Sequence, residues 1–301
     1  MNDRERELIR LVVDGDIRKA QAQAKIILNE TTTAKDKQFK EYQLRRLENR
    51  GPELITLPYN LQHLLVAQDV SNFPENRFLL RPEESAIVDK LLSTRTAALR
   101  LQELGIQYTS SLLLTGEPGT GKTELARYIA HVTDLPFVYV KFSGLVESYL
   151  GKTQTNIGRV FDYARNAPCV LCIDEIDAIG MSRGGSDDIA EMSRVVIALM
   201  QELDNIKNDV VVIGTTNRPD KLDKALFRRF TLVHEVKTLD IADIEVLADK
   251  FFASVGYPLA VEEREEFFAQ FNHAAPASKV IATCTSRIID RVVAEEAAKV
   301  V

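Results

Sequence analysis

A phosphate-binding loop is the sequence feature that most constrains how this chain folds. Residues 116–123 read GEPGTGKT and fit the pattern GxxxxGK[ST]. A short apolar segment, residues 111–114, precedes the loop, and a helical pattern, residues 124–130, follows it. A strand, a glycine-rich loop and a helix in this order bring backbone N–H groups and a helix N-terminus to one point. The sequence therefore predicts a phosphate site rather than an incidental glycine-rich turn.

Most residues of the loop, and the one after it, are expected to contact a bound nucleotide. Lys122 supplies positive charge for the β- and γ-phosphates, and the Thr123 hydroxyl is an expected ligand of Mg²⁺. Glycines permit backbone angles and close approaches that a Cβ would block. ATP and Mg²⁺ are therefore the expected cofactors. The expected nucleotide-binding residues are Gly116, Pro118, Gly119, Thr120, Gly121, Lys122, Thr123 and Glu124.

Two acidic residues follow a second apolar strand pattern. Residues 169–173 are apolar and lead directly into Asp174 and Glu175. Ligands of open α/β sheets bind at the carboxyl ends of the strands. We therefore expect Asp174 to hold Mg²⁺ through an intervening water and Glu175 to be the general base that activates the attacking water. A solvated strand cap is the weaker interpretation, because the phosphate loop lies upstream.

A third strand pattern, residues 210–214, ends in Thr215, Thr216 and Asn217. An amide at Asn217 could hold the attacking water beside the γ-phosphate without adding charge. Asn at a strand end is usually a turn former when it stands alone. The catalytic interpretation of Asn217 therefore depends on its register with the other two motifs.

The composition indicates a soluble globular chain. It has 301 residues, of which 45% are hydrophobic and 27% charged, and this length corresponds to about two domains. No stretch approaches the roughly 18 apolar residues of a membrane span, and the charged N-terminus has no apolar signal core. A cytoplasmic protein with no membrane partner is the default expectation. The net charge of −6 argues against nucleic acid as the main partner.

Strand and helix patterns alternate in the middle of the chain, which predicts a parallel sheet covered on both faces. The expected strands are residues 111–114, 137–140, 169–173, 210–214 and 231–236. After residue 239 the pattern is helical, with expected helices at residues 240–255, 261–271 and 278–299. The predicted fold class is α/β: a P-loop large domain, a small all-helical lid and an N-terminal helical module.

Four segments are expected along the chain. They are an N-terminal helical docking module at residues 1–50, a linker at 51–80, the large α/β domain at 81–238 and the lid at 239–301. The large domain opens with a helix pattern that has Pro82 in its first turn. The N-terminal helices are either a solvated appendage or a docking module; docking is favoured because their apolar faces need something to bury against.

Three cysteines do not form a disulfide framework. Cys169 and Cys172 make a CxxC, but they lie on a strand pattern. Residues at i and i+3 of a strand point to opposite faces of a sheet. Two buried small side chains are therefore expected, rather than a redox or zinc pair.

Taken together, the motifs resemble those of AAA+ ATPases, and within that superfamily the AAA group that includes katanin, spastin and FtsH-type ATPase domains. The matching segments are Walker A at residues 116–123, Walker B at 169–175, sensor 1 at Asn217 and the second region of homology at 222–230. The resemblance implies an enzyme that hydrolyses ATP to ADP and phosphate. It also implies a ring, and a homo-hexamer in particular.

Arg228 and Arg229 match the arginines that stand before a Phe in the family's second region of homology. In the resembling family such an arginine finger reaches the neighbouring subunit's nucleotide and stabilises charge on the transferring phosphoryl group. The residues that usually separate the family's two arginines are missing in this chain. The motif therefore leaves open which of the pair is the finger, and a surface arginine pair is the alternative.

Tyr149, Leu150 and Gly151 resemble the family's aromatic–aliphatic–glycine pore loop, whose aromatic side chain grips an extended polypeptide. Packing of Tyr149 under the sheet edge is the alternative. Residues 183–188 are a weaker candidate for a second pore loop. Many AAA+ lids carry a sensor-2 arginine, but residues 276–279 read PASK, in agreement with the katanin-like group.

The resemblance favours a protein unfoldase or translocase that threads polypeptide through a ring pore. A separate effector such as a protease, docking on residues 1–50, is a further expectation. Two alternatives stay open: a nucleic-acid remodelling or DNA-loading helper, and a nucleotide switch that turns over little ATP. The acidic composition and the Tyr149 loop favour a protein substrate.

Overall fold

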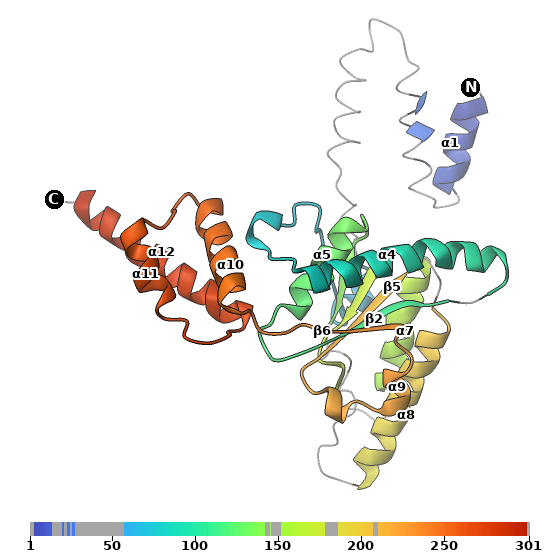
Figure 1. Cartoon of the computed structure of the whole chain (residues 1–301). Coiled ribbons are helices and arrows are strands. Elements are labelled where there is room, and N and C mark those ends of the chain that lie inside the picture. The colour runs from blue at the N-terminus through green and yellow to red at the C-terminus, as the bar shows by residue number, and fades with distance from the viewer. Residues whose placement is uncertain are drawn as a thin grey trace, which may run out of the picture. The chain divides into compact units, whose positions relative to one another are not determined.

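The computed structural model divides the chain into two compact units, Met1–Leu54 and Ile55–Val301 (Figure 1). In the first unit it describes helix α1, Asp3–Val13, which begins where the sequence predicts helix. The rest of the expected N-terminal module lies largely outside the described residues, and the domain boundaries stay predictions. The described residues are 3–13, 20, 23, 24, 26, 27, 57–106, 108–141, 145, 152–177, 186–206 and 210–299.

In the described part of the second unit, six strands form one sheet in the order β1-β3-β4-β5-β2-β6. Strand β1 pairs antiparallel with β3, and the other neighbours pair in parallel. The strands are β1 (Leu65–Gln68), β2 (Ser110–Thr115), β3 (Phe137–Val140), β4 (Val170–Ile173), β5 (Val211–Thr216) and β6 (Leu232–Glu235). This mostly parallel sheet confirms the predicted α/β class.

Strand β1 lies in the segment that the sequence predicts as a linker. It is four residues long, and Leu65 is 1% exposed beside the buried Leu61 and Leu64. These leucines belong to the same hydrophobic cluster as β3 and β4. This part of the segment therefore belongs to the core of the large domain.

Helices cover both faces of the sheet, because successive residues of each strand point to opposite sides. One cluster joins alternate strand residues to α7 and α8, and the other joins the intervening residues to α4 and α5. Cys169 and Cys172 are buried in opposite clusters, as the sequence predicts. The helices are α4 (Pro82–Glu103), α5 (Lys122–Val132), α7 (Lys152–Asn166), α8 (Ser186–Asp204) and α9 (Lys224–Phe227), with short 3₁₀ turns at Tyr59–Leu61, Glu75–Arg77 and Pro219–Lys221.

The elements described after β6 are helices, which confirms the predicted helical C-terminal part (Figure 1). Helix α10 begins after Asp240, whose carboxylate caps it by accepting from the N–H of Asp243 at 2.8 Å. A separate cluster holds these helices together, with Phe252 and Phe267 edge to face at 5.2 Å between ring centroids. The helices are α10 (Ile241–Ser254), α11 (Val261–Phe268) and α12 (Ala277–Lys299). Within the described residues, no helix has the length and apolarity needed to cross a membrane.

A buried carboxylate fastens the start of α4. Glu84 is 3% exposed and accepts hydrogen bonds from the Arg81 guanidinium. Burial alone would raise the pKa of Glu84, but the contact with His234 and the hydrogen bonds and charge of Arg81 outweigh it and lower the pKa from 4.5 to about 2. Ionised Glu84 therefore stabilises the folded chain.

Glu84→Gln is expected to remove a stabilisation that depends on pH. Because the folded pKa lies below the ordinary value of 4.5, the contribution is full above that value and disappears as the pH falls from 4.5 to about 2. The shift corresponds to about 3 kcal/mol at neutral pH. Urea unfolding at a series of pH values should show the two proteins converging toward low pH.

Glu83→Gln is the matched control for this experiment. Glu83 is the neighbouring residue, its side chain is 62% exposed, and its ion pair with Lys237 spans 3.7 Å. An exposed pair of this kind contributes about 0–1 kcal/mol. A difference between wild type and Glu84→Gln that stays constant across the whole pH range would contradict the assignment.

Candidate nucleotide-binding site

The phosphate loop connects the carboxyl end of β2 to the start of α5, as the sequence predicts. Gly116, Gly119 and Gly121 have φ angles of 139°, 79° and 104°, in the region that favours glycine. A Cβ on Gly116 would lie 2.2 Å from the carbonyl oxygen of Val236, and one on Gly119 would lie 2.2 Å from Ser278 Oγ. Glycine is therefore required both by the turn itself and by the segments packed against it.

Lys122 joins the loop to the end of β5. Its side chain is buried, and Nζ donates to the carbonyl oxygens of Gly116 at 3.0 Å and Glu117 at 2.8 Å. Nζ also donates to Asn217 Oδ1 at 2.6 Å. Burial lowers the pKa of Lys122, against the opposing effect of Asp174. The structure thus brings together the residues predicted for Walker A and sensor 1.

The Asp174 carboxylate, just past the end of β4, is a shared acceptor. The Thr123 hydroxyl lies 3.4 Å from Oδ2, and the Tyr139 hydroxyl donates to the same oxygen at 3.2 Å. Thr215 donates to Oδ1 from the end of β5. Burial, followed by the charge of Asp174, raises the pKa of Tyr139 to about 12, so its hydroxyl stays a donor. The two residues predicted to hold Mg²⁺ therefore lie within contact of each other.

Glu175 is held in a strained conformation beside this carboxylate. Its φ is 50°, which is uncommon for a residue with a side chain. Its backbone N–H donates to Asp174 Oδ1 at 3.1 Å and to Thr215 Oγ1 at 3.3 Å. These bonds fix the backbone while the Glu175 side chain is exposed, as a residue that meets water and a bound ligand needs to be.

Sequence reasoning missed a second layer of contacts behind the site. Buried Asp177 accepts from Thr216 Oγ1 at 2.5 Å, and Thr216 Oγ1 in turn accepts from the N–H of Arg218 at 2.9 Å. These bonds fasten the end of β5 to the turn after β4. Tyr139 and Thr215 were missed as well, because only the strand order, with β3 and β5 on either side of β4, brings them to Asp174.

A small, largely apolar cavity adjoins the phosphate loop and was also missed. Its walls come from three regions that are far apart in the sequence, so no local pattern marks them. The lining residues are Arg77, Phe78, Leu79, Arg81 and Glu84 around the start of α4; Thr120, Gly121, Glu124 and Leu125 of the loop and α5; and Val236, Leu239, Leu247, Ala277 and Ile281 of the lid and its connection.

The two candidate finger arginines differ in their surroundings. Arg229 Nε lies 2.9 Å from Asp204 Oδ1 at the end of α8. Arg228 follows α9 directly and is exposed, and within the described residues its side chain has no hydrogen bond or ion pair. Phe230, the residue after Arg229, is 6% exposed and anchors the segment in the core. Among the described residues, Arg229 thus has an internal carboxylate partner, whereas Arg228 is exposed to solvent without one.

The predicted pore loop lies outside the described residues. This applies to Tyr149, Leu150 and Gly151, and to residues 183–185 of the weaker second candidate. The described flanks are the buried Leu145 and the start of α7 at Lys152.

Comparison with known proteins agrees with this geometry. Residues 112–238 match the profile described as "ATPase family associated with various cellular activities (AAA)". The peroxisomal ATPase pex6 of Schizosaccharomyces pombe is 45% identical over 147 residues, which are 46% of this chain and 16% of that protein. The proteasome-activating nucleotidase of Methanosphaerula palustris is 36% identical over 200 residues, which are 62% of this chain and 48% of that protein.

An uncharacterized AAA family ATPase, y4kL of Sinorhizobium fredii, is 41% identical over 130 residues, or 43% of this chain and 39% of that protein. The chain thus spans less than half the length of each of these three relatives. The residues that match the family profile, 112–238, contain the loop, the strand-end acids and Asn217. Residues 112–238 accordingly form a domain of the AAA family of ATPases, as the sequence motifs predict.

Proposed function

We propose that this chain hydrolyses ATP to ADP and phosphate where β2, β4 and β5 end. The observation that carries the proposal is the convergence of Lys122, Asn217 and Asp174 on one point of the sheet edge. A phosphate loop, an acceptor for Mg²⁺ and a side chain that can hold water are the parts that phosphoryl transfer to water needs.

The chemistry assigns one task to each residue. Loop N–H groups and the N-terminus of α5 hold the phosphates, and the Lys122 ammonium exchanges its carbonyl partners for phosphate oxygens. Asn217 orients a water in line with the γ-phosphorus. Glu175 accepts the proton of that water as the new P–O bond forms and the bond to the ADP oxygen breaks.

The donors at the site fit Mg²⁺. The Thr123 hydroxyl and the Asp174 carboxylate are hard oxygen ligands, and Mg²⁺ in nucleotide sites takes few protein ligands besides water and phosphate oxygens. When bound, the ion neutralises charge on the β- and γ-phosphate oxygens. Thr123 and Asp174 are the residues proposed to hold it.

Glu175→Gln tests the proposed base. The change keeps the size of the side chain and removes proton acceptance, so turnover should fall by at least about a hundredfold. Binding of a fluorescent ATP analogue should stay within a few-fold of wild type, because Glu175 is not placed among the phosphate ligands. Phosphate release at saturating ATP and fluorescence titration measure the two quantities.

Glu262→Gln is the control, because Glu262 is an exposed residue of α11 and has no part in the proposed site. Its turnover should equal that of wild type. Turnover of Glu175→Gln within a few-fold of wild type would remove Glu175 from the mechanism. Undetectable turnover in wild type would instead favour the nucleotide-switch alternative.

Arg228 is the better of the two finger candidates, and a finger that acts on another subunit requires a ring. Arg229 has an intramolecular carboxylate at 2.9 Å, whereas exposed Arg228 has no ion pair within the described residues. An exposed guanidinium without an intramolecular partner can reach a phosphate on a neighbouring subunit. We propose a homo-oligomer, hexameric as in the resembling family, in which Arg228 completes the adjacent site.

Mixing two inactive variants tests this arrangement. Arg228→Ala should lower turnover by on the order of a thousandfold, and Glu175→Gln should be inactive as above. When the two are mixed, some sites combine Glu175 of one chain with Arg228 of the next, so activity should rise above that of either variant alone. Phosphate release across a series of mixing ratios is the measurement.

Arg229→Ala mixed with Glu175→Gln is the parallel arm. Since Arg229 pairs with Asp204, its loss should leave most turnover in place. Restored activity in this arm, with none in the Arg228 arm, would transfer the finger to Arg229. No restored activity in either arm would argue against a finger acting between subunits.

Protein unfolding or translocation is the proposed use of the hydrolysis cycle. The name of the Methanosphaerula palustris relative, proteasome-activating nucleotidase, links a similar nucleotidase to the proteasome. Tyr149 is the proposed grip on the polypeptide, and residues 1–50 are the proposed docking module for substrate or a separate effector. The net charge of −6 also favours protein over nucleic acid.

ATPase stimulation tests the substrate class. An unfolded model protein should raise steady-state turnover, and Tyr149→Ala should abolish the increase while keeping basal turnover. Single-stranded DNA should have no effect at low salt. Stimulation by DNA that disappears at high salt, without stimulation by protein, would replace this proposal by the nucleic-acid alternative.

A further inference from the structure

In the described part of the chain, the connection between the sheet and the lid has two residues whose backbone is bonded neither to a strand of the sheet nor to a lid segment. At its start, the N–H of Val236 donates to a carbonyl of β2 at 2.8 Å. At its end, Leu239 pairs with Ala275 of the lid through bonds of 2.8 and 2.9 Å. Lys237 and Thr238 lie between these fixed points. A rotation of the lid relative to the sheet would be absorbed by the backbone of these two residues.

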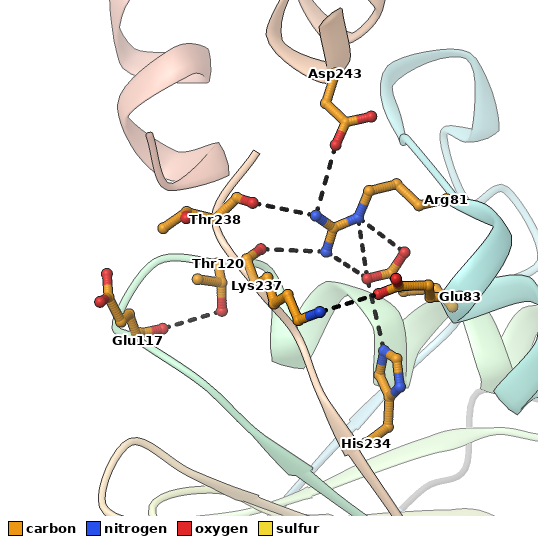
Figure 2. A network of polar contacts seen from close by, with 9 residues as sticks. Arg81, Glu83, Glu117, Thr120, His234, Lys237, Thr238 and Asp243 are labelled. Carbon is orange, nitrogen blue, oxygen red and sulfur yellow. Dashed lines mark hydrogen bonds and ion pairs between the residues drawn. The ribbon is translucent and has the colours of Figure 1, made fainter. Parts of the chain in front are cut away.

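Arg81 holds the carbonyl groups of both hinge residues (Figure 2). Its Nη1 donates to the Thr238 carbonyl oxygen at 3.2 Å, and its Nη2 donates to the Lys237 carbonyl oxygen at 3.2 Å. The side chain is only 14% exposed. The planar guanidinium presents several donors in a fixed fork, so one side chain can hold two neighbouring carbonyl groups at once.

The same guanidinium bridges carboxylates on the two sides of the hinge. Glu84, in the first turn of α4, accepts from Nε at 2.9 Å and 3.1 Å. Asp243, in the first turn of lid helix α10, has Oδ2 at 3.6 Å from Nη1. His234 of β6 adds a further contact, with Nε2 at 3.6 Å from Glu84. Arg81 therefore connects α4, the hinge and the lid.

This connection forms part of the wall of the cavity beside the phosphate loop. Arg81 and Glu84 line the cavity together with Leu247, Ala277 and Ile281 of the lid. The angle of the lid therefore sets the shape of the cavity. A ligand that fills this cavity contacts both sides of the hinge.

We infer that Arg81 is a positioning residue that fixes the lid over the nucleotide site by holding both hinge carbonyls and Asp243. Loss of the guanidinium frees the hinge, and the lid then samples orientations in which the cavity is incomplete. The inference about lid position is independent of the ligand. Its consequence for ATP affinity rests on the proposed function.

Lid position can be measured directly in the full chain without nucleotide. Cysteines introduced at Ala97 of α4 and Glu265 of α11, both exposed, carry a spin label each. The three native cysteines are buried and should not react under native conditions. Labelled chain is diluted with unlabelled chain, so that distances between subunits do not contribute. Pulsed electron–electron double resonance should give a narrow distribution of distances between the two labels for wild type and a broad one for Arg81→Gln.

Two further variants separate the hinge bonds from general stability. Arg81→Lys keeps the positive charge beside Glu84 but loses the fork, so it should unfold close to wild type in urea and still give a broadened distribution. Asp243→Asn leaves the Glu84 pair intact and should broaden the distribution less. If Arg81→Gln fails to fold, Arg81→Lys and Asp243→Asn still decide the question.

Arg165→Gln is the matched control. Arg165 is similarly shielded, with a side chain 22% exposed, and pairs with Glu202 at 2.7 Å and Asp162 at 2.6 Å within the large domain. Its loss should lower stability without changing the distance distribution. A distribution as narrow as wild type in both Arg81 variants, or equal broadening in Arg165→Gln, would overturn the inference.

Titration with a fluorescent ATP analogue adds the functional consequence. If about a tenth of the lid orientations remain competent, the apparent Kd of Arg81→Gln rises about tenfold, and that of Arg165→Gln does not change. A broadened distance distribution with an unchanged Kd would separate lid position from nucleotide binding. It would overturn the predicted effect of Arg81 on nucleotide affinity. Absence of binding in wild type would instead count against the proposed function, and the distance measurement would still decide the role of Arg81.

Discussion

The buried ammonium of Lys122 is the contact on which the rest of the site depends. It joins the phosphate loop after β2 to Asn217 after β5, and these two strands are neighbours with Thr115 opposite Thr216. A buried charge is costly unless it is hydrogen-bonded, so its three acceptors hold the loop in one conformation. The parallel register places Asp174, after β4, beside the same point. Sheet order and one buried cation thus define the proposed position of the phosphates.

The lid is connected to this site at two separate places, so a change in lid orientation affects the site. On one side the N–H of Ser278, in the first turn of α12, donates to the Gly119 carbonyl at 3.0 Å. On the other side Arg81 holds the hinge. Lid rotation therefore disturbs either the loop or the hinge, and a ligand that reshapes the loop acts on the lid through a direct bond. Hydrolysis at a site so connected can change the lid angle without a long relay.

The sequence predicts most of the sheet because its parallel strands are short apolar runs beside turn signals, and it predicts the loop because the chemistry requires glycine at fixed spacing. Strand β1 was missed since Leu65–Gln68 is short and lies among prolines. Tyr139 and Thr215 escaped because their roles arise from strand order, which no local pattern encodes. Arg81 escaped for the same reason: its carbonyl partners are more than 150 residues away. Motifs formed by neighbouring residues can be predicted from the sequence, whereas contacts between distant segments cannot.

Burial and partners distinguish three arginines that a sequence pattern treats alike. Arg81 is 14% exposed, and each of its guanidinium nitrogens has an acceptor within the chain, so its charge is used in intramolecular contacts. Arg229 is 42% exposed but forms an ion pair with Asp204, and this ion pair would break if the Arg229 side chain turned away. Arg228 is exposed beside the buried Phe230, and the described part of the chain offers its guanidinium no carboxylate. Turning Arg228 toward the phosphate of another subunit would break no ion pair of the described residues, and this is the energetic reason why it suits the proposed action between subunits better than its neighbour does.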